Sequence, residues 1–359
     1  MKPLFEIRKF LREEKLYAYL LIGILLIYAF FLAFTERKEK QESPAITKMK
    51  KAEQTIKAKK SEREFLEEAI KDRGTAILLF SITTLFLAAM GGGLIVDAVF
   101  MANYFHKRPT IMNVRAMEPV DWGLRDLAKV IILFISFGFA TSFVLGFLQK
   151  FFFKNLDDNF VILLHTTIND LAVFFMILFF VLKKYKKKLG DIGLNFKLWA
   201  KDILLGVLSY LGTLPVFITI LLILLVIATL FSYEPPPHPL VEIFVEEDKR
   251  NPYLIGYSIF LACVLGPIIE EVFFRGFCYP ALKKVWGMKI AMVATACFFA
   301  WIHQSTFAFW PIFVLGMVLV YIYEKRGSLL PSITLHIIHN SVFITYFFIM
   351  KRVFLDKLL

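Results

Sequence analysis

Cysteine is scarce in this chain, with three residues among 359. All three, Cys263, Cys278 and Cys297, lie in apolar segments, and none forms a CxxC pair. The sequence therefore gives no sign of a metal site of the CxxC type. We expect the three thiols to be buried as apolar side chains rather than joined in disulfides.

Two other patterns are also missing. The chain contains no HExxH sequence, which is the zinc-binding signature of many metallopeptidases. It shows no paired internal repeats with broken helices, which are typical of secondary transporters. The first absence argues against a zincin-type metallopeptidase, and the second against a transporter.

Charged residues form only 20% of the chain, whereas hydrophobic residues form 58% and phenylalanine alone numbers 40. A soluble domain would not expose so much apolar surface without aggregating, so we predict an integral, multi-pass membrane protein. The net charge of +12 does not indicate a nucleic-acid partner, because Lys and Arg cluster between apolar segments, where loops meet anionic lipid. From composition and charge, the expected partner is the lipid bilayer.

Apolar segments of about 20 residues can cross a membrane as helices. Their number predicts an all-α, polytopic membrane bundle of eight or nine transmembrane helices. The second segment is too long for one untilted span, and Gly91, Gly92, Gly93 and Asp97 within it would suit a break or a re-entrant turn. The segments cover residues 16–34, 75–105, 127–151, 159–182, 203–231, 254–282, 288–302, 310–323 and 329–350.

Basic residues between these segments predict the orientation, since loops rich in Lys and Arg stay in the cytoplasm. Five lysines lie within residues 183–188. Counting helices outward from this loop places the N-terminus in the cytoplasm and the acidic, proline-rich loop 234–250 outside. Residues 1–105 are expected to form a retained anchor, a charged helical excursion over residues 35–73 and a second membrane segment. A loop over residues 106–126 then leads to a core over residues 127–350.

One apolar segment contains Glu270, Glu271 and Arg275 in the pattern EExxxR. Carboxylates within a lipid-spanning helix are costly and need partners. Glu271 and Arg275 are four residues apart, which suits an ion pair on one helix face, and Glu270 is rotated about 100° away, free to act as a general base. Pro267 is expected to kink or restart the helix, which would place both carboxylates in a first turn. A purely structural Glu–Arg cluster is the alternative.

Two later segments supply candidate partners. Phe299 and His303 share a helix face, as do His336 and Asn340, because each pair is four residues apart. His336 and Asn340 could donate hydrogen bonds to a developing oxyanion, or could simply bond helices together. His339 points roughly 100° away from their face. Three further polar residues in apolar segments, Asp97, Asn169 and Asp170, are expected to bond between packed helices, with the lining of a cavity as the alternative.

These motifs, together with Phe313 and Gly316 in the pattern FxxG, stand in the order EExxxR, FxxxH, FxxG and HxxxN. In this order the chain resembles the type II CAAX-processing endopeptidases and bacteriocin-processing or immunity proteins, the CPBP family. The resemblance implies a helical bundle around an intramembrane cavity and a glutamate-dependent endopeptidase. Its substrate would be a membrane-associated peptide or protein, of the prenylated CAAX type in part of the family. By the same resemblance Glu270 and His303 would activate water, His336 and Asn340 would stabilise the oxyanion, and Glu271 and Arg275 would support the site.

Two alternatives remain open from the sequence. The same Glu and His residues could bind zinc as a metallo-endopeptidase, although Asn is an unusual zinc ligand, so the expected cofactor is none and zinc is the alternative. The chain could instead be a non-catalytic immunity or scaffold protein with the same fold. The intact set Glu270, His303, His336 and Asn340 favours the enzyme.

Overall fold

A computed structural model describes residues 2–34, 71–108, 119–233, 243–244 and 251–355. Within these residues the chain is all-α, as predicted, and contains no strand. Two regions named in the sequence analysis lie largely outside the described residues. They are the charged excursion, for which residues 35–70 are not described, and the acidic loop, of which only Ile243 and Phe244 are described.

The helices form two compact units, each built from separate stretches of the chain. Unit 1 comprises residues 1–41, 117–195 and 268–295. In this unit α2 and α7 both pack against α6. Its elements are α1 (Lys2–Glu13), α2 (Lys15–Phe34), α6 (Leu124–Phe151), α7 (Asp158–Leu178), the π-helix η1 (Phe179–Lys184), the 3-10 turn η2 (Leu189–Ile192) and the π-helix η4 (Val272–Cys278).

Unit 2 comprises residues 42–116, 196–267 and 296–359. Here α8 packs against both α5 and α14. The elements are α5 (Arg73–Phe105), α8 (Trp199–Leu230), α10 (Pro252–Phe260), the π-helix η3 (Leu261–Leu265), α13 (Phe309–Arg326), α14 (Leu330–Met350) and the π-helix η5 (Lys351–Leu355). Two helices, α11 (Gly266–Glu271) and α12 (Tyr279–Ile302), contribute residues to both units.

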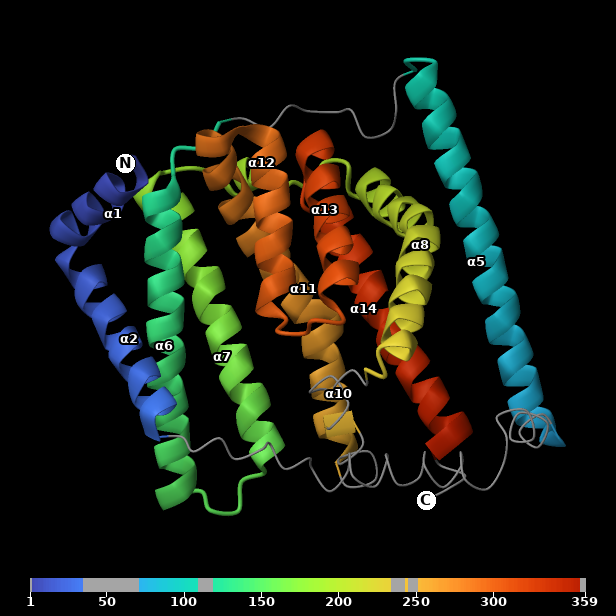
Figure 1. Ribbon diagram of the computed structural model, residues 1–359, viewed down its shortest axis with the longest axis horizontal. Helices are drawn as coiled ribbons and strands as arrows, with labels where there is room; N and C mark the ends of the chain where they lie inside the picture. Colours follow the sequence, from blue (N-terminus) through green and yellow to red (C-terminus); the bar gives the residue numbers. More distant parts are fainter. Residues whose placement is uncertain (1, 35–70, 109–118, 234–242, 245–250, 356–359) are drawn as a thin grey trace. The chain divides into compact units, whose positions relative to one another are not determined.

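The glycines of α5 do not break the helix. The 33 residues of α5 are continuous, so it is about 50 Å long, and the expected break or re-entrant turn is wrong. A Cβ on Gly93 would lie 2.2 Å from the carbonyl oxygen of Leu211, and one on Gly212 would lie 2.8 Å from the Asp97 carboxylate. The small residues therefore allow α5 and α8, which run side by side in Figure 1, to approach closely.

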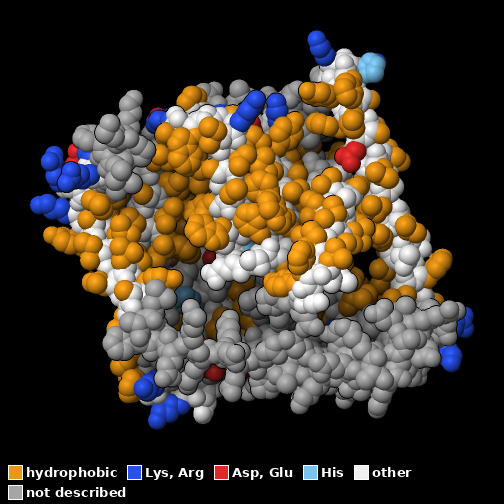
Figure 2. All heavy atoms as spheres, viewed as in Figure 1, with side chains coloured by type: hydrophobic (Ala, Val, Ile, Leu, Met, Phe, Trp, Pro, Cys, Tyr) orange, Lys and Arg blue, Asp and Glu red, His pale blue; other side chains and the backbone are white. Residues whose placement is uncertain are grey.

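Six helical runs in the described part of the chain are long and apolar enough to cross a membrane. Many of their large apolar side chains face outward, including Phe80, Phe143 and Leu230, which are each about three-quarters exposed. Figure 2 shows hydrophobic side chains spread over the outer surface of the helices. Since water would oppose this exposure, the chain is an integral membrane protein, as predicted.

The six runs alone do not confirm the expected count of eight or nine helices. One run, Pro252–Ile302, joins two segments that the sequence analysis separated. It is not straight, because Gly287 has φ +74° and ψ 171°, outside the helical region. Residues 15–30 form a shorter apolar helix, and α13, with 18 residues, is not among the six.

Candidate functional site

The EExxxR segment forms the predicted ion pair. Arg275 Nη1 donates a 2.7 Å hydrogen bond to Glu271 Oε1, and both side chains are completely buried. Glu271 is the last residue of α11, and Arg275 lies within the π-helix η4. Because a lone buried charge is strongly unfavourable, each of these residues depends on the other.

The helix does not restart at Pro267, contrary to the sequence prediction. The backbone stays helical from η3 into α11, and Gly266 donates to Leu261 in the i−5 pattern of a π-helix. The argument that placed Glu270 and Glu271 in a first helical turn is therefore wrong. The proline is accommodated by local widening, since its ring would clash with the carbonyl four residues earlier in a regular α-helix.

A carboxylate that the sequence analysis assigned to packing lies near Glu270. Asp170 on α7 is close enough to Glu270 for the two charges to repel each other, and α7 packs against η4 in unit 1. The neighbouring Asn169 bonds to His165 of its own helix and accepts a hydrogen bond from Thr141 of α6. Asp170 is turned about 100° from Asn169, toward a different neighbour. Its position midway along a membrane span was the signal in the sequence.

In unit 2, Phe299 brings two predicted site residues together. Its buried ring lies edge-to-face with His303, at a centroid distance of 5.0 Å, and with His336, at 5.6 Å. His303 Nδ1 is 2.7 Å from the Phe299 carbonyl oxygen. Since a carbonyl only accepts, Nδ1 carries the hydrogen, and Nε2 of the neutral ring is the acceptor. This tautomer suits a residue that accepts a proton from water.

Asn340 has a structural partner that the sequence analysis did not predict. Its Nδ2 donates a 2.8 Å hydrogen bond to the carbonyl oxygen of Ala262, in η3. Continuing the i−5 ladder of η3 would require the N–H of Pro267 to donate to Ala262, and proline has no N–H. Asn340 thus supplies the donor that Pro267 lacks. The second N–H of the amide is the one that an oxyanion would use.

We expect a rescue experiment to separate these two roles of Asn340. Asn340→Ala should cost about 1–3 kcal/mol of stability, because Ala262 loses its donor. In a Pro267→Ala background the new N–H can bond to Ala262, so the same substitution should cost much less. Thermal unfolding of the four proteins of this cycle in detergent provides the measurement. An equal loss in both backgrounds would contradict the bracing role, whereas a catalytic defect that persists after the rescue supports the oxyanion role.

The FxxG motif has a packing role within unit 2. A Cβ on Gly316 would lie 3.1 Å from Ala296 and 3.3 Å from the Phe299 ring. Gly316 therefore allows α13 to approach the part of α12 that carries Phe299. Two buried polar contacts fix α13 further: Arg326 Nε donates to Asp202 of α8 at 2.6 Å, and Ser332 of α14 donates to the Leu319 carbonyl at 3.0 Å.

Substituting this glycine should disturb both histidines through Phe299. We expect Gly316→Val to cost about 1–3 kcal/mol through overpacking and to lower activity. Gly256→Val is the matched control, because Gly256 is a helical glycine of the same unit at which an added Cβ would have no atom within 4 Å. Thermal unfolding compares the two, and equal stability would show that the close approach at Gly316 is unimportant.

Other candidates of the sequence analysis have packing roles. His339 contacts the rings of Phe217 and Phe343 at centroid distances of 5.0 and 4.8 Å. All three cysteines are free thiols, with Cys263 and Cys278 buried and Cys297 partly so. These findings agree with the predicted apolar role of the thiols.

Site residues therefore group within each unit. Glu270, Glu271 and Arg275 belong to unit 1, whereas the second set, His303, His336 and Asn340, belongs to unit 2. The meeting of the two sets in one site stays a prediction. In the described part of the chain, no group of three or more His, Cys, Asp or Glu side chains could hold a metal ion.

Comparison with known proteins agrees with the resemblance drawn from the motifs. Residues 252–342 match the family model described as type II CAAX prenyl endopeptidase Rce1-like. The match spans roughly a quarter of the chain and includes all four motifs. No curated protein and no solved structure matches the chain. At the level of the family, the match supports a CAAX-type intramembrane endopeptidase.

Proposed function

We propose that this protein is an intramembrane, glutamate-dependent endopeptidase that cleaves a membrane-associated peptide or protein. The family match over residues 252–342 carries the proposal, because it contains Glu270, His303, His336 and Asn340 together. The buried Glu271–Arg275 pair and the contact of Phe299 with both histidines support it.

The reaction is a hydrolysis in which water is the nucleophile. Glu270 and the Nε2 acceptor of His303 orient a water molecule, and Glu270 removes a proton as the oxygen attacks the scissile carbonyl carbon. N–H groups of His336 and Asn340 donate to the oxyanion that forms. The C–N bond then breaks, and the proton held by Glu270 passes to the leaving amine. The products are a peptide with a new carboxylate and one with a new amine.

The family description suggests the first substrates to test. Because the matched family is that of a CAAX prenyl endopeptidase, C-terminal peptides bearing a prenylated cysteine form the first class. Unprenylated peptides of the same sequence form the second. The basic residues of the 183–188 loop favour a cytoplasmic position for that loop and for the N-terminus, so we place both on the cytoplasmic side.

Purified protein in detergent, incubated with both peptide classes, tests the proposal directly. We expect cleavage by the wild-type protein and none by Glu270→Gln, read by mass spectrometry of the products. Absence of cleavage across a broad library of membrane peptides would instead support the non-catalytic scaffold. A strong chelator distinguishes the catalytic type: activity should survive it. Complete inhibition that zinc restores would overturn the glutamate–water scheme in favour of a metallo-endopeptidase.

A further inference from the structure

The segment before α6 is bound to the π-helix η4. Trp122 is completely buried, and its ring stacks on Phe277 with centroids 5.5 Å apart and planes 10° apart. The indole Nε1–H donates a 2.9 Å hydrogen bond to the Phe277 carbonyl oxygen. Phe277 is also fully buried and lies two residues beyond Arg275. Trp122 therefore contacts both the ring and the backbone of Phe277 in η4, the helix that contains Arg275.

The neighbours of Trp122 are fixed in turn. Lys284 donates a 2.9 Å hydrogen bond to the Asp121 carbonyl, and Lys187 pairs with the Asp121 carboxylate at 3.0 Å. Phe180 of η1 lies edge-on to Phe277 at 6.1 Å. Since these contacts join two separate stretches of unit 1, residues 117–195 and 268–295, Trp122 cannot shift without disturbing several of them.

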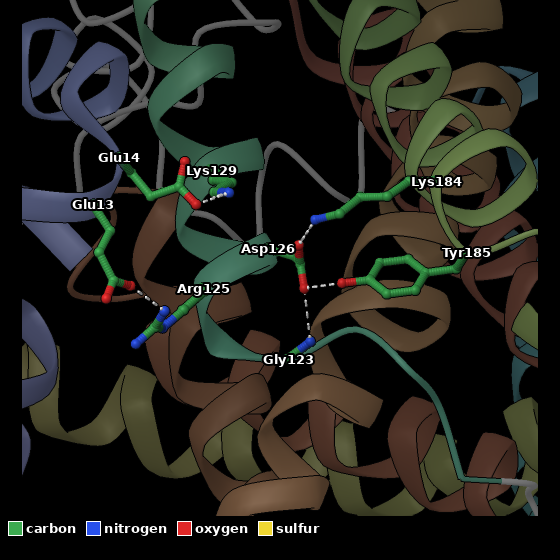
Figure 3. Close-up of polar contacts among 8 residues, drawn as sticks. All are labelled: Glu13, Glu14, Gly123, Arg125, Asp126, Lys129, Lys184 and Tyr185. Atoms are coloured by element: carbon green, nitrogen blue, oxygen red, sulfur yellow. Dashed lines mark hydrogen bonds and ion pairs between the residues drawn. The ribbon is translucent and has the colours of Figure 1, made fainter. Parts of the chain in front are cut away.

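Asp126, four residues after Trp122, fixes the start of α6 through further polar contacts (Figure 3). Its carboxylate accepts hydrogen bonds from the Gly123 backbone N–H at 3.1 Å and the Tyr185 hydroxyl at 2.5 Å, and it pairs with Lys184. Burial, the hydrogen bond to Asp126 and the charge of Asp126 all raise the pKa of Tyr185, so the phenol remains a donor. The turn that carries Trp122 is therefore held at both ends.

This attachment matters because η4 is π-helical. π-helices are rare, short, and often found at functional sites. If η4 relaxed by one residue to the α-helical form, the residues on one side would rotate by about 100° relative to those on the other. That rotation would turn Glu270 and Glu271 of α11 relative to Phe277, which Trp122 contacts through its ring and its indole N–H. The stacking and the hydrogen bond between Trp122 and Phe277 oppose this rotation.

We propose that Trp122 is a positioning residue for the peptidase site, which keeps η4 π-helical and so sets the rotation of Glu270 and Glu271 about the helix axis relative to Phe277. This inference rests on the proposed function for its catalytic consequence. Trp122 acts through η4 and not on the substrate.

Trp122→Phe tests the hydrogen bond while keeping an aromatic ring to stack. We expect kcat to fall about 10–100-fold, the size of effect that a small misplacement of catalytic groups produces, with KM nearly unchanged. Trp286→Phe is the matched control, because Trp286 lies in the same unit and is 46% exposed. Activity is expressed per folded molecule, so that a loss of stability alone does not count as a loss of kcat.

Hydrogen–deuterium exchange of the backbone amides in residues 272–279 provides a second readout that needs no activity. Exchange there should rise in Trp122→Phe and stay unchanged in Trp286→Phe. If the wild-type protein cleaves nothing, the proposed function fails, and the exchange result still decides whether Trp122 holds η4. Unchanged exchange, or a kcat per folded molecule equal to that of the control, would overturn the positioning role.

Discussion

Glu270→Gln will abolish cleavage while leaving the fold nearly intact. Glutamine keeps the size and hydrogen-bonding capacity of the side chain but cannot accept a proton from water. General acid–base residues contribute about 10²–10⁴ in rate, so kcat should fall by at least this range. Because Glu270 is half-buried and the i,i+4 ion pair involves Glu271, the substitution leaves the main buried charge pair in place.

The measurement is kcat per folded molecule, with thermal unfolding in detergent as the check on folding. Asp170→Asn is an informative comparison, since it neutralises the carboxylate that lies near Glu270 on α7. It removes repulsion and retains the proposed base, so activity should survive. Full activity in Glu270→Gln would exclude Glu270 as the base and direct attention to another proton acceptor.

Arg275→Ala should produce the largest loss of stability. It leaves the completely buried Glu271 carboxylate without its 2.7 Å partner. Breaking a buried ion pair by removing one member typically costs about 3–5 kcal/mol, because the remaining charge is not compensated. We expect lower expression, a lower unfolding temperature and loss of activity together.

Arg326→Ala is the matched control for this effect. The Arg326–Asp202 pair is similarly buried, at 2.6 Å, and joins α13 to α8 in unit 2. Both substitutions should destabilise the protein, but only Arg275→Ala should also lower kcat per folded molecule. Unchanged stability of Arg275→Ala would contradict the supporting role of the Glu271–Arg275 pair.

Much of the fold was predictable because membrane helices follow from local composition. Apolar length identified the helical segments, and the i,i+4 rule identified the Glu271–Arg275 pair, since both depend only on residues near in sequence. The order of four motifs gave the resemblance to the CPBP family, and the family-model match over residues 252–342 agrees with it. The roles of Glu270, His303, His336 and Asn340 in catalysis remain predictions.

Predictions from local patterns were wrong where the conformation of one helix depends on its contacts with another. Gly91, Gly92 and Gly93 looked like a break in α5, but α8 packs against Gly93 and the helix continues. Pro267 looked like a restart, but the backbone widened into η3 and Asn340 supplied the missing donor to Ala262. In both cases a residue of another helix decides the outcome. Leu211 of α8 packs closely against Gly93, and Asn340 of α14 donates the hydrogen bond that Pro267 cannot.

By itself, the sequence determined that the chain is α-helical and membrane-embedded, and which carboxylate pairs with Arg275. Hydrophobicity and helical spacing are properties of single segments, so they can be read without a partner. Only the tertiary structure decided that Phe299 contacts His336, that Asp170 lies near Glu270, and that Trp122 contacts Phe277 of η4. These contacts join residues from separate helices or loops, and their directions depend on how each helix is rotated against its neighbours.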